Sequence, residues 1–545
     1  MSRDAVPKRH RARTAAGVRE QGTLARAVQE LGRPVRQPSR AKRRQLQSEL
    51  TRVSGVVRES ECRNWSCDAG EPTRGTQSSK VKTPAEWSAR HRNMDSCEGK
   101  MKGRQIPEPV STRLERIAKL AKGAPGMAIR SLAHYIDVDW LKEAHKLTRK
   151  DGAPGVDGQT AEEYAANLEG NLQALLDHAK SGTYRAPPVR RVHIPKGKGT
   201  ETRPLGIPTF EDKVLQRAIV MALEAVYEQD FLSCSYGFRR GRSQHQMLQD
   251  LWQTMTAMGG GWVIEIDIRR YFESIPHDSL QEILRRRVVD GVLLRLVGKW
   301  LNAGVLDDGA MLHPESGSPQ GGVVSPMLAN IYLHTVLDEW FENEVKPRLV
   351  RDARLFRYAD DAVLVFANEA DARKVYEVLP KRFEKYGLAL HPEKTRLFEF
   401  RRPTVKDGGD DIKRATFDLL GFTHHWGKSL RGKWIVIRKT AKDRFQRALK
   451  RIVDWCKRHR HESIREQQKA IARRLRGHFE YFGITNNSKA LVRFRYEVVL
   501  AWRKWLSRRS QKARLNWKKM NALLARYPLP PARVTHSSRW RPANP

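Results

Sequence analysis

The stretch LFRYADDAVLVF at positions 355–366 places two adjacent carboxylates, Asp360 and Asp361, between two short apolar runs. Hydrophobic and β-branched residues on both sides favour strands, and an Asp pair favours a turn because its side chains can accept hydrogen bonds from nearby backbone amides. The stretch therefore predicts a β-hairpin with acid at its tip. Taken alone, the pair fits an ordinary turn as well as a functional site, because Asp is common at turns.

A third acid lies near the end of another apolar run. The segment WVIEIDI at positions 262–268, which contains Asp267, has the composition of a buried strand. A charge in such a strand is costly unless it is paired or bound to a metal, so Asp267 is the strongest functional candidate of the three acids. If the two strands are neighbours in one sheet, Asp267 and Asp360 can bind two Mg²⁺ ions about 4 Å apart and support in-line phosphoryl transfer, the reaction of nucleotide addition.

The composition indicates a large basic protein with a polyanionic partner. The 545 residues suggest roughly three or four domains, and a net charge of +41 with a pI near 10.4 exceeds what solubility requires. Nucleic acid is the first candidate partner, and a membrane surface is the alternative. The sequence has no apolar run of the ~18 residues that a span needs, and residues 1–20 lack the apolar centre of a signal peptide. We therefore expect an intracellular, cytoplasmic protein with no membrane partner.

The first 105 residues have no pattern typical of a folded domain. They are basic and poor in aromatic and β-branched residues, so we expect a largely disordered extension. The basic charge of this extension either helps to capture RNA or belongs to a merely solvated tail, and the sequence favours neither alternative. The five cysteines of the chain are scattered, which fits a reducing compartment. Cys62, Cys67 and Cys97 offer zinc ligation as an alternative, but no second pair of matching spacing follows.

From residue 106 onward, helical and strand patterns interleave without strict alternation, which predicts an α+β fold. Segments 189–195 and 203–207 predict a basic hairpin whose cations, Lys196, Lys198 and Arg203, suit a triphosphate. Its tip is not a P-loop, because the complete GxxxxGK[ST] motif is missing. Helices are predicted over 212–231, 278–301 and 370–386, and another begins with Ser325 as cap and Pro326 in its first turn.

Two regions combine basic residues with aromatic ones. In the loop SYGFRRGRS at 235–243, Tyr236 and Phe238 either stack on a template strand or belong to the core. From about residue 439 to 527, predicted helices have apolar stripes and faces crowded with Arg and Lys. Because the whole chain is strongly basic, we interpret these faces as an RNA-binding surface rather than a solvated one. The candidate RNA-binding residues are Arg239, Arg242, Arg473, Arg474, Arg476, Arg508 and Arg509.

A series of ordered motifs extends over roughly residues 152–537. The motifs are APGVDG at 153–158, RPLGIP at 203–208, YGFR at 236–239, DIRRYFESIPH at 267–277, PQGGVVSP at 319–326, YADD at 358–361, EKT at 393–395, LGF at 420–422 and LRGHFEYF at 475–482. In these motifs and their order the chain resembles group II intron-encoded proteins, which are reverse transcriptases with a maturase domain.

The resemblance implies a metal-dependent active site built on the acids. Asp267 and Asp360 would bind two Mg²⁺ ions, with Asp361 beside them as a third catalytic acid. The backbone carbonyl of Ile268 would be a further metal ligand.

The resemblance also implies contacts to the incoming nucleotide and to the primer. Phe272 would be the aromatic gate that blocks a ribose 2′-hydroxyl, and Lys394 would assist the departure of pyrophosphate. The implied nucleotide-binding residues are Lys196, Arg203, Phe272, Gln320 and Lys394. The implied primer grip consists of Leu420, Gly421 and Phe422.

The fold implied by the resemblance is a right-hand polymerase. N-terminal helices and fingers would occupy 106–260, a palm with an antiparallel sheet and the catalytic acids 261–430, a helical thumb and maturase domain 431–530, and a tail 531–545. Glu273 and Arg240 depart from the family's motifs, but neither is an implied ligand. Since no cysteine follows Cys456, we expect no DNA-endonuclease domain of the kind built on His and Cys pairs.

The expected function is that of an RNA-directed DNA polymerase that binds its group II intron RNA and assists splicing and mobility. Its partners would be the intron RNA, an RNA template, a DNA primer and dNTPs. One alternative is a splicing maturase whose polymerase is silent, although the intact acids and Phe272 argue against it. Another is a domesticated, intron-free reverse transcriptase.

Overall fold

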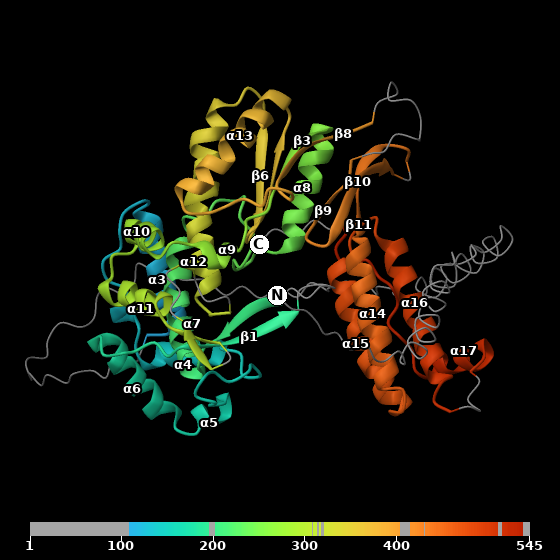
Figure 1. Ribbon diagram of the computed structural model, residues 1–545, viewed down its shortest axis with the longest axis horizontal. Coiled ribbons are helices and arrows are strands. Elements are labelled where there is room, and N and C mark those ends of the chain that lie inside the picture. Colours follow the sequence, from blue (N-terminus) through green and yellow to red (C-terminus); the bar gives the residue numbers. More distant parts are fainter. Residues whose placement is uncertain are drawn as a thin grey trace, which may run out of the picture. The chain divides into compact units, whose positions relative to one another are not determined.

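Figure 1 shows the protein as a computed structural model, which describes residues 108–195, 202–307, 309–312, 316–317, 321–403, 415–429, 431–510 and 515–537. All of these residues belong to one unit, Arg104–Pro545. The predictions for residues 1–105, Lys196, Lys198 and Gln320 lie outside the described residues. The predicted mixture of helices with largely antiparallel sheets is confirmed.

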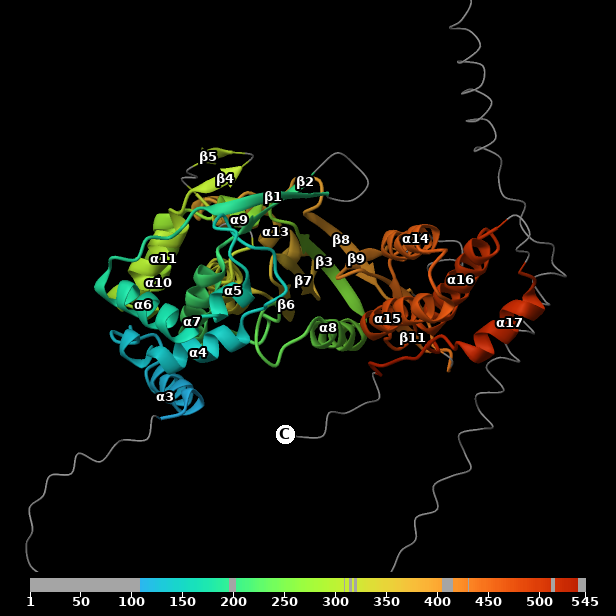
Figure 2. The same cartoon turned by 90° about the horizontal axis from the view of Figure 1, so that it is seen from below.

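The predicted acids belong to a four-stranded antiparallel sheet with the strand order β6–β7–β3–β8. Its strands are β3 (Gly260–Ile266), β6 (Ala353–Tyr358), β7 (Asp361–Phe366) and β8 (Arg396–Arg401). Helices α8 (Gln244–Met258) and α13 (Glu369–Lys385) cover its two faces (Figure 2). Val363 and Val365 pack in the cluster that contains α8, whereas Leu364 and Phe366 pack in the cluster that contains α13. Because both faces of β7 are covered, its sequence is apolar without interruption from Ala362 to Phe366.

The largest hydrophobic cluster joins the α13 face of this sheet to the N-terminal helices. Helix α7 (Phe210–Tyr227) packs against α3, α4 and α12 in this cluster. The helices of this region are α3 (Val110–Gly123), α4 (Val138–Leu147), α5 (Ala161–Ala165), α6 (Leu168–Ser181), α9 (Tyr271–Ser274), α10 (His277–Arg287), α11 (Gly291–Leu301) and α12 (Ser325–Leu333). Helix α12 continues as a π-helix, η2 (His334–Val345), which the 3₁₀ turn η3 (Lys346–Arg348) follows. Another 3₁₀ turn, η1 (Ala133–Tyr135), lies between α3 and α4.

Two smaller sheets complete the strands. The first has the order β2–β1–β4–β5 and contains the predicted basic hairpin as β1 (Val189–Pro195) and β2 (Thr202–Ile207), with β4 (Val305–Asp307) parallel to β1 and β5 (Ala310–Leu312) beyond it. The second has the order β11–β10–β9 and consists of β9 (Phe417–Leu419), β10 (Phe422–Lys428) and β11 (Trp434–Thr440).

The predicted C-terminal helices follow the last strand and form a cluster of their own. They are α14 (Lys442–Arg458), α15 (Ile464–Phe482), α16 (Ser488–Leu506) and α17 (Trp517–Arg526). Trp502, Phe494 and Leu475 are fully buried between them. Tyr481 of α15 donates a hydrogen bond to the carbonyl of Leu420, which connects these helices to the β9–β10 hairpin.

Some element boundaries differ from the prediction. The single helix predicted over 278–301 is two helices, because the carboxylate of Asp290 accepts hydrogen bonds from Val292 and Leu293 and caps α11. Ser325 is the first residue of α12 rather than its cap, a position that Val324 holds, while Pro326 lies in the first turn as predicted. Within the described residues, none of the helices has the length and apolar character that a membrane span requires.

Candidate active site

The tip of the β6–β7 hairpin is a two-residue turn made by Ala359 and Asp360. Tyr358 and Asp361 are the last paired residues of the two strands, so the turn is as short as the commonest hairpin connections. Ala359 has a φ angle of +57°, which is unfavourable for a residue with a Cβ atom. The surrounding structure must therefore hold this turn, and such strain is typical of functional sites.

Asp267 reaches the same edge of the sheet through β3. This strand is antiparallel to β7, and the last pair in their register is Ile266 with Ala362. The next residue of β3 is Asp267 and the preceding residue of β7 is Asp361, so both acids leave the sheet at one edge. The hairpin tip adds Asp360 there. The structure thus brings the three predicted acids together from two strands that are distant in sequence.

The environment of this cluster raises the pKa of both acids of the hairpin tip. Burial is the main reason why the pKa of Asp361 is raised to about 6, and the charges of Asp360 and Asp267 raise it further. Burial also raises the pKa of Asp360, an effect that Asp267 reinforces and that Arg203 and Arg357 partly offset. A divalent cation would relieve this repulsion between like charges.

The oxygen donors at this edge suit Mg²⁺ but do not form a closed cage. Mg²⁺ prefers carboxylate and carbonyl oxygens and keeps several positions for water or phosphate. Besides the carboxylates of Asp267 and Asp360, the Ile268 carbonyl is a candidate metal ligand. The β-bridge between Ile268 and Leu390 is formed by hydrogen bonds of the Asp267 carbonyl and the Arg269 amide, and it does not use the Ile268 carbonyl. In the described part of the chain, no group of three or more His, Cys, Asp or Glu side chains could hold a metal ion. A cation held by Asp267, Asp360 and the Ile268 carbonyl would complete its coordination with oxygens of water or of a substrate phosphate.

The segment before β8 holds Asp267 from the other side. The amide of His391 donates to the Asp267 carbonyl at 2.8 Å, and the hydroxyl of Thr395 lies 3.2 Å from the same carbonyl and 3.3 Å from the Asp267 amide. Lys394 places its Nζ 3.5 Å from Asp267 Oδ2. Both side chains keep substantial solvent contact, so the pair is weak and Lys394 can turn towards another anion.

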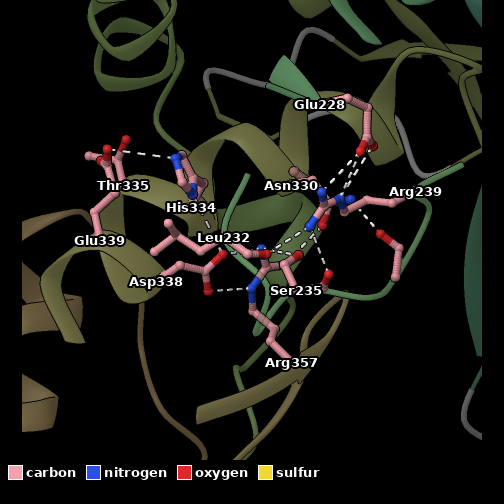
Figure 3. A network of polar contacts seen from close by, with 12 residues as sticks. Glu228, Leu232, Ser235, Arg239, Asn330, His334, Thr335, Asp338, Glu339 and Arg357 are labelled. Atoms are coloured by element: carbon pink, nitrogen blue, oxygen red, sulfur yellow. Dashed lines mark hydrogen bonds and ion pairs between the residues drawn. The ribbon is translucent and has the colours of Figure 1, made fainter. Parts of the chain in front are cut away.

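A buried arginine supports the turn from within the protein (Figure 3). Arg357 of β6 is fully buried and donates through Nε and Nη2 to the two carboxylate oxygens of Asp338, at 2.7 and 2.5 Å. Its Nη1 donates to Asn330 Oδ1 at 2.9 Å and to the Ala359 carbonyl at 3.1 Å, and its Nη2 also donates to Ser235 Oγ at 2.7 Å. The guanidinium thus connects the strained turn to α12, to η2 and to the loop before α8.

The partner of this arginine stays ionised despite its burial. Burial alone would raise the pKa of Asp338, but the charge of Arg357 and hydrogen bonds from Arg357 and His334 outweigh it and lower that pKa. His334 Nδ1 lies 3.8 Å from Asp338 Oδ2. The ion pair is therefore maintained at any pH at which an ordinary carboxyl group is ionised.

The loop before α8 packs directly on the turn. Asn330 Nδ2 donates to the carbonyl of Gly237 at 2.6 Å, and the amide of Tyr236 donates to the carbonyl of Arg357 at 2.9 Å. A Cβ atom on Gly237 would lie 2.3 Å from the Ala359 nitrogen, so no larger residue fits. The sequence alone gave Asn330 and Arg357 no role in the site. The signal that could have identified Arg357 is a charge that directly follows the apolar pair Leu355–Phe356 and lies three residues before the Asp pair.

Phe272 and Arg203 belong to two further elements at the site. Phe272 of α9 is partly buried against the core, and its neighbour Tyr271 is fixed by a hydrogen bond of 2.6 Å from its hydroxyl to the Ala329 carbonyl. Arg203 of β2 is close enough to Asp360 for its charge to lower the pKa of that acid. The nucleotide contacts of both residues stay predictions.

The three residues of the predicted primer grip form the turn between β9 and β10 and the start of β10. Leu420 and Gly421 have φ angles of +47° and +81°, as a tight two-residue hairpin requires. Phe422 is fully buried against Tyr481 and Phe482. Its ring supports the turn from inside and is not available to a primer, so only the turn itself can make the predicted contact.

The predicted RNA-binding arginines fall into two groups. Arg239 is not a free cation, which corrects the prediction: its guanidinium is buried, forms an ion pair of 3.0 Å with Glu228 and donates to two backbone carbonyls. Arg509 likewise donates to the carbonyls of Arg460 and Glu462. Arg474 lies over Trp455 and Arg242 over Tyr236. The exposed members are Arg473, Arg476 and Arg508.

Comparison with known proteins identifies a domain around this site. The family model described as "Reverse transcriptase (RNA-dependent DNA polymerase)" matches residues 194–424, which include all three acids. Protein YkfC of Escherichia coli (strain K12) is 36% identical over 333 residues, which cover 55% of this chain and 86% of that protein.

Other relatives have names that refer to introns. The group II intron-encoded protein LtrA of Lactococcus lactis subsp. cremoris is 35% identical over 231 residues, which cover 42% of this chain and 38% of LtrA. An uncharacterized 91 kDa protein in the cob intron of Schizosaccharomyces pombe is 41% identical over 240 residues, which cover 43% of this chain and 29% of that protein. The match thus spans well under half of each of these two relatives. With the acids at one sheet edge, these similarities show that the chain belongs to the family of group II intron-encoded reverse transcriptases and maturases.

Proposed function

We propose that this protein is an RNA-directed DNA polymerase that extends a DNA primer on an RNA template and also binds a group II intron RNA, whose splicing and mobility it assists. The observation that carries the proposal is the meeting of Asp267, Asp360 and Asp361 at one sheet edge, where the charge of Asp267 raises the pKa of both neighbouring acids and that of Asp360 raises the pKa of Asp361. Mg²⁺ and dNTPs would be its cofactor and substrates, and the cytoplasm its location.

Each residue at the edge has a defined role in this proposal. Asp267 and Asp360 would hold two Mg²⁺ ions, which, when bound, stabilise the attacking and leaving oxygens of the phosphoryl transfer. Asp361 adds negative charge beside them. Lys394, next to Asp267, offers a proton donor and a positive charge to the departing pyrophosphate. Arg203, on the hairpin strand, contacts the triphosphate with a two-pronged guanidinium.

The architecture fits the parts of a right-hand polymerase. The β6–β7–β3–β8 sheet with α8 and α13 would be the palm, and the β1–β2 hairpin with the N-terminal helices the fingers. Helices α14–α17 would combine the thumb with the maturase domain. Their exposed arginines would bind intron RNA, so RNA binding would be separate from polymerisation.

The deciding experiment is primer extension on an RNA template with Mg²⁺ and dNTPs. The wild-type protein should extend the primer, and Asp360→Ala combined with Asp361→Ala should reduce extension by at least about a thousandfold, because the transition state loses its charge stabilisation. The control variant is Asp352→Ala, which removes an exposed acid just before β6. Undiminished extension by the double variant would refute the site. Extension by neither protein would favour the alternative of a maturase with a silent polymerase.

The gate proposed for Phe272 has a separate test. Replacing Phe272 with Val should raise the incorporation of ribonucleotides relative to deoxyribonucleotides by roughly tenfold or more, because the smaller side chain leaves room for a 2′-hydroxyl. Tyr271→Phe is the matched control, since it keeps ring volume and removes only the hydrogen bond to Ala329. An unchanged ratio in the Phe272 variant would remove the gate role.

A further inference from the structure

We propose that Phe238 stacks on a base of the primer–template duplex beside the catalytic turn, an inference that rests on the proposed polymerase function. The side chain of Phe238 is 53% exposed, more than Tyr496 at 42% or Trp517 at 39%. Tyr236, two residues earlier in the same motif, is only 4% exposed and donates from its hydroxyl to Asp250 at 2.7 Å. The two aromatics of this motif therefore have different roles: Tyr236 packs in the core and Phe238 faces solvent.

The backbone holds Phe238 in an unfavourable conformation. Its φ angle is +56°, a region that Gly and Asn occupy far more readily than a bulky aromatic residue. An exposed phenyl ring contributes little to the core, so fold stability does not explain why this position carries one. Strain that persists at a solvent-facing residue next to an active site is the pattern expected of a binding group.

The residues on both sides of Phe238 are held in place by hydrogen bonds, and Figure 3 shows those of Arg239. On one side, the carbonyl of Gly237 accepts a hydrogen bond of 2.6 Å from Asn330. On the other, Arg239 pairs with Glu228 and donates to the Leu232 carbonyl at 2.8 Å and to the Ser235 carbonyl at 2.9 Å. The backbone of such a held loop loses little conformational freedom when a ligand binds.

The location of the ring identifies the ligand as the nucleic acid being copied. Gly237, the residue before Phe238, packs so closely on Ala359 that a Cβ atom would meet its nitrogen at 2.3 Å. Consecutive Cα atoms are about 3.8 Å apart and successive bases of one strand about 3.4 Å, so Phe238 stands within a few base steps of the catalytic acids.

Arginines near Phe238 add positive charge that can attract the phosphates of the nucleic acid. Arg240 is mostly exposed, 3.7 Å from Glu224, and Arg242 lies over the ring of Tyr236 at 5.4 Å. Aromatic faces that stack on bases, next to cations that attract phosphates, are the usual means of binding nucleic acid without sequence preference. A hydrophobic protein partner would not explain these charges, and it is tested as the competing outcome.

The test compares three variants of the full chain with the wild-type protein. Phe238→Ala removes the ring, Phe238→Asn removes it while suiting the positive φ angle, and Phe238→Trp keeps a stacking face. The control is Met127→Ala, which truncates another exposed apolar side chain, one that is 66% exposed. The measurements are the Kd for a fluorescent RNA–DNA primer–template without dNTPs, the processivity of extension, and Tm.

We expect Phe238→Ala and Phe238→Asn to raise the Kd by roughly tenfold and to shorten the extension products without lowering Tm. Phe238→Trp and Met127→Ala should behave like the wild type. A wild-type Kd and processivity in the Ala and Asn variants would overturn the proposal and leave a protein partner as the reason for the exposed ring. A fall in Tm that accounts for the weaker binding would also overturn it. The Kd is measured without nucleotide addition, so failure of this inference can be told apart from failure of the proposed function. If the wild-type protein extends primers and these variants bind primer–template normally, only this inference is refuted.

A base analogue identifies the strand that is contacted. 2-Aminopurine is placed at successive positions of the template or of the primer, and its fluorescence is measured in the complex. Quenching that Phe238→Ala relieves and Met127→Ala does not should occur on one strand near the primer end. If no position on either strand shows a Phe238-dependent change, the ring does not stack on the duplex.

Discussion

At the scale of single residues, Asp361 is the acid of the cluster for which the structure gives both an altered pKa and a clear consequence for stability. Its pKa of about 6 lies above the value of about 3.9 expected in the unfolded chain. The folded state therefore disfavours the charged form, and this loss of stability develops as the pH rises from about 4 to about 6 and is complete above pH 6. Ionised Asp361 therefore destabilises the fold at neutral pH.

Asp361→Asn should therefore stabilise the protein at neutral pH. At pH 7.5 in EDTA we expect a gain of about 1 kcal/mol, which is the two-unit shift reduced because the side chain of Asp361, although closely surrounded by protein atoms, keeps contact with solvent. At pH 4.5 the gain should shrink, because most of the wild-type carboxyl is then protonated in the folded state. Urea denaturation at the two pH values measures this, with Asp352→Asn as the control. A stability change that is equal at both pH values would contradict the raised pKa of Asp361 in the folded protein.

The sequence predicted residues whose chemistry is locally visible and missed those whose role depends on packing. Asp267 and Asp360 stand out as charges next to apolar runs, Lys394 follows from the EKT motif of the family resemblance, and the structure brings the three to one place. Asn330 and Asp338 lie in an ordinary helical pattern, and only tertiary structure turns them towards Arg357. For the same reason, the sequence could not separate buried Arg239 from exposed Arg473.

At the scale of elements, the hairpins were predictable because their strands and turns are encoded locally, in apolar runs around an Asp pair or a Leu-Gly turn. The break between α10 and α11 and the π-helical course of η2 were not. The break depends on the side chain of Asp290, which also accepts hydrogen bonds from the distant amides of Leu132 and Ala133. Helix η2 carries Asp338, whose position is fixed by its ion pair with Arg357 of β6.

The ion pair between Arg357 and Asp338 should contribute separately to stability and to activity. Arg357→Met alone leaves a buried carboxylate without its partner and should destabilise the fold by about 3–5 kcal/mol. The double variant Arg357→Met with Asp338→Leu should recover most of this loss, because an apolar pair can replace a buried ion pair. Extension should nevertheless stay about a hundredfold low, since the Ala359 carbonyl has lost its donor and the turn can shift.

Urea denaturation and single-nucleotide extension at saturating dNTP measure the two effects. The control removes an exposed pair with the same substitutions, Arg286→Met with Glu282→Leu, and should change stability by less than about 1 kcal/mol. A double variant that regains both wild-type stability and wild-type extension would show that Arg357 serves the fold only, and not the position of the turn.

At the scale of the whole molecule, a net charge of +41 predicts a polyanionic partner but not where that partner binds. Many arginines neutralise carboxylates or cap carbonyls inside the protein. Arg287, for example, pairs with Asp230 and donates to the carbonyl of Ala121 in α3. The charge available to RNA is therefore only the exposed part. On the C-terminal helices it includes Arg473 and Arg476 of α15 and Arg508 just after α16.

Replacing these three exposed arginines with Gln should weaken binding of intron RNA while primer extension on a short template persists. Each phosphate contact contributes about 0.7–0.9 to the slope of log K against log salt, so the slope should fall by about 2. The matched control, Arg285→Gln with Arg286→Gln and Arg351→Gln, removes the same charge from exposed positions elsewhere. Equal losses in both triple variants would mean that RNA responds to net charge alone. A lower slope in the first variant only would place the RNA on the C-terminal helices, apart from the acids that extend the primer.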